Sequence, residues 1–134
     1  PFDYENGVGL YDTNGKFAAL KNKNIRLLLR SLFVQEISFH FENDAACFGI
    51  GESYFGEAKS YSKSMAITLG TGIGCTFMKD KRVIKSGNNI PKGGEVFHLP
   101  YKKATADDYF STRWFVQFAK EEYDVTPLVL KKLQ

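Results

Sequence analysis

The sequence predicts an α/β fold, because a strand, a helix and a second strand follow one another and lead into a hairpin. The expected first strand spans 34–41, where Val and Ile alternate with polar residues, and the expected helix runs from 43 or 44 to about 59. The second strand, 64–69, leads through a glycine-rich turn into two short strands, 75–78 and 82–85. The 134 residues suffice for one such domain or for parts of two lobes.

Further elements flank this unit on both sides. Asn24 is suited to cap a helix at 24–32, because its side chain can accept a hydrogen bond from the first turn and apolar residues recur on one face. The other expected elements are hairpin-type turns at Asn6-Gly7 and Asn14-Gly15, an amphipathic helix at 107–123 and a helix start at Thr126-Pro127.

Composition excludes several classes of protein. The chain is 43% hydrophobic, 25% charged and 15% aromatic, which is typical of a folded soluble protein and argues against disorder. The net charge of +3 comes from scattered Lys and Arg, without the basic stripe of a nucleic-acid binder. No apolar run reaches the roughly 18 residues of a membrane span. Cys47 and Cys75 lie in apolar segments without metal-ligand spacing; as reduced core residues they fit a cytoplasmic location.

A carboxylate at the end of the first expected strand is one candidate for chemistry. Asp44 lies where that strand gives way to the helix, and α/β folds place their sites at such strand ends. The helix N-terminus favours an ionised carboxylate, which can act as a base at neutral pH. An ordinary N-cap aspartate would look the same, so the residue alone leaves both interpretations open.

The turn after the second strand reads Gly70-Thr71-Gly72-Ile73-Gly74. Such a run can offer successive backbone N–H groups to an anion, and glycine lets the backbone approach a phosphate closely. Thr71 adds a hydroxyl donor. The turn is neither a GxGxxG nor a Walker loop, and a simple glycine-rich hairpin turn is the alternative.

Two polar residues, Glu95 and His98, follow a loop that contains three glycines. If they share one turn of helix, their spacing of three puts both side chains on one face. A carboxylate and an imidazole together can hold vicinal hydroxyls of a sugar. Half of a metal site and a pair of ordinary surface residues are the alternatives.

These motifs, in this order, resemble the ROK family (repressor, open reading frame, kinase). Its members include bacterial glucokinases, fructokinases and N-acetylhexosamine kinases, and also sugar-responsive repressors. The resemblance covers most of the chain, is weakest after Tyr123, and rests on Asn43-Asp44-Ala45 with Gly51-Glu52, on 68–74, and on Gly94-Glu95 with His98.

The resemblance implies an actin-like fold made of two ribonuclease-H-type lobes. Residues 1–60 would form the end of the small lobe, and 61–134 the start of the large one. It also implies an ATP-dependent kinase of a hexose or N-acetylhexosamine, with Mg²⁺ and ATP as cofactors, a small-molecule sugar as partner and a homodimer as a candidate assembly. Asp44 would be the general base, the sugar contacts would be Asn43, Glu95, His98 and Asp107, and the phosphate contacts would be Gly70, Thr71, Gly72 and Gly74.

Several departures from the family pattern qualify this resemblance. Segment 99–106 has no cysteine where the family usually carries a zinc loop, so zinc is not expected. Asp107 stands where the family has a glutamate, which puts its sugar contact in doubt. The family's N-terminal Asp-x-Gly-Gly-Thr motif is missing, so we expect a middle piece that is inactive alone. A sugar-sensing regulator of the same family and a sugar-binding module without catalysis stay open as alternatives.

Overall fold

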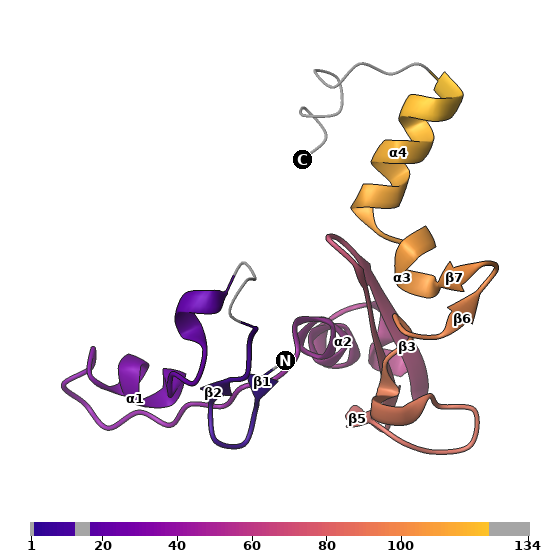
Figure 1. Cartoon of the computed structure of the whole chain (residues 1–134). Coiled ribbons are helices and arrows are strands. Elements are labelled where there is room, and N and C mark those ends of the chain that lie inside the picture. The colour runs from indigo at the N-terminus through magenta and orange to yellow at the C-terminus, as the bar shows by residue number, and fades with distance from the viewer. Residues whose placement is uncertain (1, 13–16, 124–134) are drawn as a thin grey trace. The chain divides into compact units, whose positions relative to one another are not determined.

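The structure is a computed structural model that describes residues 2–12 and 17–123 (Figure 1). It divides into two compact units, Pro1–Asn43 and Asp44–Gln134. The expected turn at Asn14-Gly15 and the expected helix start at Thr126-Pro127 lie outside the described residues. The division into lobes at residue 60 concerns the architecture of the family and stays a prediction.

The first unit begins with the expected hairpin. Strands β1 (Phe2–Asp3) and β2 (Val8–Gly9) pair antiparallel. Gly7 has a φ of +71°, and its N–H donates to the Asp3 carbonyl at 2.8 Å. A Cβ at this position would also lie 2.7 Å from the ring of Phe41, so conformation and space both require glycine.

A short 3₁₀ helix and an α-helix follow. They are η1 (Ala18–Leu20) and α1 (Ile25–Arg30). The predicted cap of α1 is confirmed, because the Asn24 side chain accepts a hydrogen bond from the Leu27 N–H at 2.9 Å.

The prediction of a strand at 34–41 is wrong. The segment bends at residues 34 and 35 and has no strand partner within the described residues, and Val34 is fully exposed. Arginine side chains of α1 bind its carbonyls instead: Arg26 donates to Phe39, and Arg30 donates to Gln35 at 2.6 Å. An alternating sequence is a strand only where another strand pairs with it, and here side chains satisfy the backbone.

The second unit is built on a three-stranded antiparallel sheet in the order β3 (Lys63–Leu69), β4 (Ile73–Lys79) and β5 (Arg82–Ile84). The three strands predicted for this region are confirmed, and the register pairs Ile67 with Cys75. The β4–β5 turn holds Asp80 and Lys81 at φ of 49° and 64°, as a two-residue hairpin requires.

Helix α2 (Asp44–Phe55) packs on this sheet and is followed by η2 (Glu57–Ser60) (Figure 1). Its buried face consists of small residues, namely Ala45, Ala46, Gly49 and Ser53. A Cβ on Gly49 would lie 2.3 Å from Thr76 Cγ2, so the helix backbone approaches β4 directly. The prediction that both cysteines lie in the core holds for Cys75 only, because Cys47 faces outward; burial raises the pKa of the Cys75 thiol.

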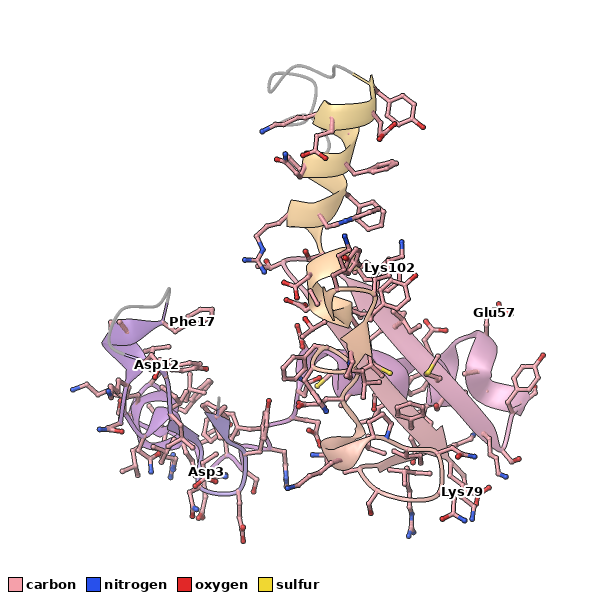
Figure 2. All side chains as sticks on the ribbon, turned by 45° about the vertical axis from the view of Figure 1, so that its right-hand side comes forward. Asp3, Asp12, Phe17, Glu57, Lys79 and Lys102 are labelled. Atoms are coloured by element: carbon pink, nitrogen blue, oxygen red, sulfur yellow. The ribbon has the colours of Figure 1, made fainter. Side chains whose placement is uncertain are left out.

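The chain then turns through η3 (Lys92–Gly94) and a small hairpin of β6 (Pro100–Tyr101) and β7 (Ala104–Thr105). Figure 2 shows Lys102, in the β6–β7 turn, far from Lys79 at the opposite end of the sheet. No helix in the described ranges is long and apolar enough to cross a membrane.

The single helix predicted at 107–123 is two helices, α3 (Ala106–Tyr109) and α4 (Thr112–Tyr123). Phe110 leaves helical geometry with a φ of −123°, and the Ser111 side chain is 1% exposed. The periodicity of apolar residues continues across the junction of the two helices. The break therefore cannot be seen in the sequence pattern, and only the tertiary contacts of the junction reveal the break.

The packing of α2 predicts opposite effects for two neighbouring glycines. Gly49→Ala should lower the free energy of unfolding by about 1–3 kcal/mol, because the new methyl group collides with Thr76. Gly51→Ala should raise it by up to about 1 kcal/mol, because a Cβ there meets nothing within 4 Å and alanine favours the helix. Urea unfolding of the natural full-length protein measures both, and equal effects of the two variants would contradict this packing.

Candidate functional site

The glycine-rich turn joins β3 to β4, and the α3–α4 junction holds it in place. The backbone N–H and the side-chain hydroxyl of Thr112 donate to the Gly70 carbonyl at 2.8 and 2.6 Å. Inside the turn, the Gly70 N–H donates to the Gly72 carbonyl at 3.0 Å. The turn is therefore fixed by hydrogen bonds on both sides.

Two amides of this turn are available to a ligand. The N–H groups of Thr71 and Gly72 have no hydrogen-bond partner within the described part of the chain, and Thr71 is exposed. With the Thr71 hydroxyl they form a set of neighbouring donors that fits the oxygens of a phosphate. The next amide, of Ile73, is occupied, because it donates to Asp107 Oδ1 at 2.8 Å.

Asp44 is the first residue of α2 and is exposed. Its Oδ1 accepts a hydrogen bond from the Ala45 N–H at 2.9 Å, which leaves its other oxygen available. The start of α2 lies against the end of the glycine turn: a Cβ added to Gly74 would be 3.0 Å from Cβ of Ala45. The predicted base and the predicted phosphate cradle are thus neighbours within one unit.

Glu95 and His98 do not share a helical turn. Glu95 is extended, and Val96 to Leu99 form a turn in which the Leu99 N–H donates to the Val96 carbonyl at 3.0 Å. Both predicted sugar residues are exposed. The ring of His98 packs edge-on against Phe97, with 5.2 Å between the ring centroids.

Two glycines determine how Glu95 leaves the preceding 3₁₀ turn. Gly93 and Gly94 have φ of 79° and 73°, and Gly94 is buried. A Cβ on Gly94 would lie 2.9 Å from the Ile84 carbonyl oxygen. These left-handed residues end the helical turn before the Glu95 position, which is why the helix considered for this motif does not form.

Asp107 lies between the two motifs of the second unit. Its N–H donates to the Phe97 carbonyl at 3.0 Å, while its carboxylate accepts from Ile73. The second carboxylate oxygen lies 3.5 Å from Arg113 Nη2. The last predicted sugar contact, Asn43, is half-buried at the end of the first unit, where its N–H donates to the Glu42 carboxylate at 2.9 Å.

Two features of this region were not among the predicted site residues. The capping box of α3, in which the Thr105 N–H and hydroxyl donate to Asp108 at 2.9 and 2.6 Å, is readable from the Thr-x-x-Asp spacing. The contact of Thr112 with Gly70 spans 42 residues and has no local sequence signal.

The described residues also bear on metal binding. Among residues 2–12 and 17–123, no three His, Cys, Asp or Glu side chains come together as a metal-ligand group. Mg²⁺ does not depend on such a group, because it is commonly held by one or two carboxylates together with substrate phosphates. A phosphate on the free amides of the turn, with a carboxylate nearby, is compatible with that mode.

Residues 15–107 match the family model described as "ROK family", which is more than half of the chain. The chain belongs to the ROK family. It is similar to the N-acetyl-D-glucosamine kinases of Vibrio parahaemolyticus, with 32% identity over 72% of the chain, and of Vibrio cholerae, with 31% identity over 60%. The chain spans 37% and 26% of the length of these two relatives.

Solved structures of sugar kinases have the same fold. A polyphosphate/ATP-glucomannokinase from Arthrobacter matches 89% of this chain and 44% of its own, with 25% identity and a TM-score of 0.63. A ROK family glucokinase from Streptomyces griseus, in complex with glucose and AMPPNP, matches 94% of this chain and 41% of its own, with 21% identity and a TM-score of 0.68. The expected α/β, actin-like fold is confirmed by this likeness.

The capping box predicts a measurable pH dependence. The hydroxyl and N–H of Thr105 donate to Asp108 and hold the pKa of this carboxyl below its usual value. The stability that it contributes is full above the pKa of an unfolded aspartate, about 3.9, and is lost as the pH falls through the lower folded pKa.

The Asp108→Asn variant should therefore have a lower melting temperature than the natural protein at pH 7. The difference in melting temperature should become smaller as the pH falls below about 4. Asp80→Asn, in the β4–β5 turn, removes an equal charge where a left-handed residue tolerates asparagine, and should show no such convergence. Thermal melts between pH 3 and 7 measure both. A constant difference for Asp108→Asn would exclude the carboxylate as the source of the effect.

Proposed function

We propose that the natural protein carrying this chain is an ATP-dependent sugar kinase of the ROK family. The observation that carries the proposal is the close approach of Ala45, in the first turn of α2 next to Asp44, to Gly74 at the end of the glycine turn that carries the free amides of Thr71 and Gly72. A base beside a phosphate cradle is the arrangement that phosphoryl transfer to a hydroxyl requires.

ATP, bound with Mg²⁺, supplies the phosphoryl group in this proposal. The free oxygen of Asp44 takes the proton of the sugar hydroxyl. At the same time the hydroxyl oxygen forms a bond to the γ-phosphorus of ATP, and the bond between the γ-phosphorus and the β-phosphate oxygen breaks, so that ADP leaves. The amides of the turn, at Thr71 and Gly72, hold phosphate oxygens. At Gly70 a Cβ would meet nothing within 4 Å, so a ligand can approach the backbone there closely, whereas Gly74 leaves room for Ala45 of α2.

The sugar is held by the predicted contacts Asn43, Glu95 and His98. The exposed carboxylate and imidazole of the last two suit hydroxyl groups, which can both donate and accept. Asp107 is the fourth predicted contact, with one carboxylate oxygen already bound to Ile73. Because both Vibrio relatives are N-acetyl-D-glucosamine kinases, we infer an N-acetylhexosamine as the preferred substrate, ahead of a simple hexose.

The first test of the base is Asp44→Asn in the natural full-length protein. The change keeps the shape of the side chain and removes its ability to take a proton, so turnover should fall by about 10²- to 10⁴-fold while sugar affinity is unchanged. Coupled ATP turnover on N-acetyl-D-glucosamine, N-acetyl-D-mannosamine and glucose measures the rate, and calorimetry measures sugar binding.

The matched control is Asp80→Asn, which removes an exposed aspartate from the far turn of the same sheet and should keep full turnover. Retained turnover in Asp44→Asn would remove Asp44 from the role of base. No turnover of any sugar by the unsubstituted protein would favour a sugar-sensing regulator or a binding module without catalysis, and sugar calorimetry and DNA binding would separate these two.

The sugar contacts are tested by His98→Ala. Loss of a hydrogen bond to a sugar hydroxyl should weaken sugar binding about fivefold or more and leave the KM for ATP unchanged. His40→Ala is the control, because it removes the other histidine, which is exposed in the first unit. Equal sugar affinity in the two variants would make His98 an ordinary surface residue.

A further inference from the structure

We propose that Asp107 is a positioning residue that ties the phosphate turn to the sugar motif, and that this is its main role in place of direct sugar contact. The inference rests on the proposed kinase function and assigns a task to one residue of that site. Its basis is the position of Asp107, whose side chain binds the glycine turn while its backbone binds the segment that carries Glu95 and His98.

The contact of the Asp107 side chain with the glycine turn is specific, and it leaves no room for a side chain at position 72. Asp107 Oδ1 accepts from the Ile73 N–H at 2.8 Å, across 34 residues of sequence. A Cβ on Gly72 would lie 2.4 Å from the same oxygen, so only glycine at position 72 lets the carboxylate reach the amide. A hydrogen bond to an ionised group is stronger than one between neutral groups, which suits a carboxylate to fixing a turn.

The backbone contacts continue this link on the other side. The Asp107 N–H donates to the Phe97 carbonyl at 3.0 Å, directly beside His98. The Ala106 N–H donates to the Leu99 carbonyl at 2.9 Å. One residue of α3 thus joins the turn at 70–74 to the segment at 95–98.

The electrostatics argue against a direct phosphate role for Asp107. Its negative charge would repel a phosphate, and its bond removes the Ile73 amide from the donors that the turn can offer. Arg113, at 3.5 Å from the other oxygen, offsets part of that charge, although its side chain is largely exposed. What the contact supplies is geometry: it fixes the chain just after the free amides of Thr71 and Gly72.

The test compares Asp107→Ala with Asp107→Asn in the natural full-length protein. Alanine removes the acceptor and should raise the KM for ATP about tenfold or more, with the KM for the sugar changed less than about threefold. Asparagine keeps an acceptor oxygen at the same place and should retain an ATP KM within about threefold of the natural value. A sugar contact would produce the reverse pattern, in which the KM for the sugar rises alone, and that result would overturn the proposal.

Two further variants separate positioning from general stability. Asp108→Ala removes the neighbouring carboxylate and the cap of α3, and should lower the melting temperature without changing the KM for ATP. Gly72→Ala should displace the Asp107 carboxylate, because the new methyl group occupies the place of its oxygen. In the Gly72→Ala background, Asp107→Ala should therefore change the KM for ATP less than it does in the natural protein. Additive effects of the two substitutions would contradict the contact.

Amide hydrogen exchange at Ile73, without nucleotide or sugar, gives a readout that does not depend on catalysis. Exchange should become faster in Asp107→Ala and stay unchanged in Asp108→Ala. If the unsubstituted protein phosphorylates no sugar, the proposed kinase function fails, and exchange at Ile73 still decides whether Asp107 holds the turn. Unchanged exchange in Asp107→Ala would overturn the inference.

Discussion

The close contact between α2 and β4 is the constraint on which the rest of the second unit depends. It exists because the buried face of the helix carries alanine, glycine and serine in place of larger side chains. At Gly49 the distance is too short for any side chain beside Thr76, and one helical turn earlier Ala45 lies against Gly74. The same small residues that let the helix approach the sheet therefore also bring the start of α2, where Asp44 lies, against the end of the glycine turn.

The glycine turn is held from a second direction, and this second contact explains the shape of the C-terminal region. Thr112 can donate twice to the Gly70 carbonyl because the helix is interrupted at Phe110 and Ser111. Ser111 is buried at this break, and its side chain accepts a hydrogen bond from the Trp114 N–H at 3.4 Å. A continuous helix would have committed the Thr112 amide to its own backbone, so the interruption frees a donor for the turn.

The sequence predicted those parts of the structure whose causes are local. Short apolar segments separated by turns identified the strands of the sheet, the glycines identified the turn, and Asn24 identified a helix cap. The failures depend on distant contacts. Segment 34–41 alternates like a strand but meets arginine side chains, and the helix expected at 107–123 is broken by its contact with a turn about 40 residues earlier. The roles of Asp44 and of the glycine turn came from the resemblance to a family and stay predictions, because periodicity alone does not suggest them.

Asp107 shows what a departure from a family pattern can mean in the structure. An aspartate in place of glutamate shortens the side chain by one methylene, which from the sequence puts a sugar contact in doubt. In the structure the short side chain fits the available space, because its carboxylate lies against Gly72 and accepts the hydrogen bond from the Ile73 amide. A glutamate would place one more carbon in that gap and would have to move either the turn or α3. The shorter side chain therefore fits the positioning role that we propose for Asp107, in which its carboxylate holds the glycine turn.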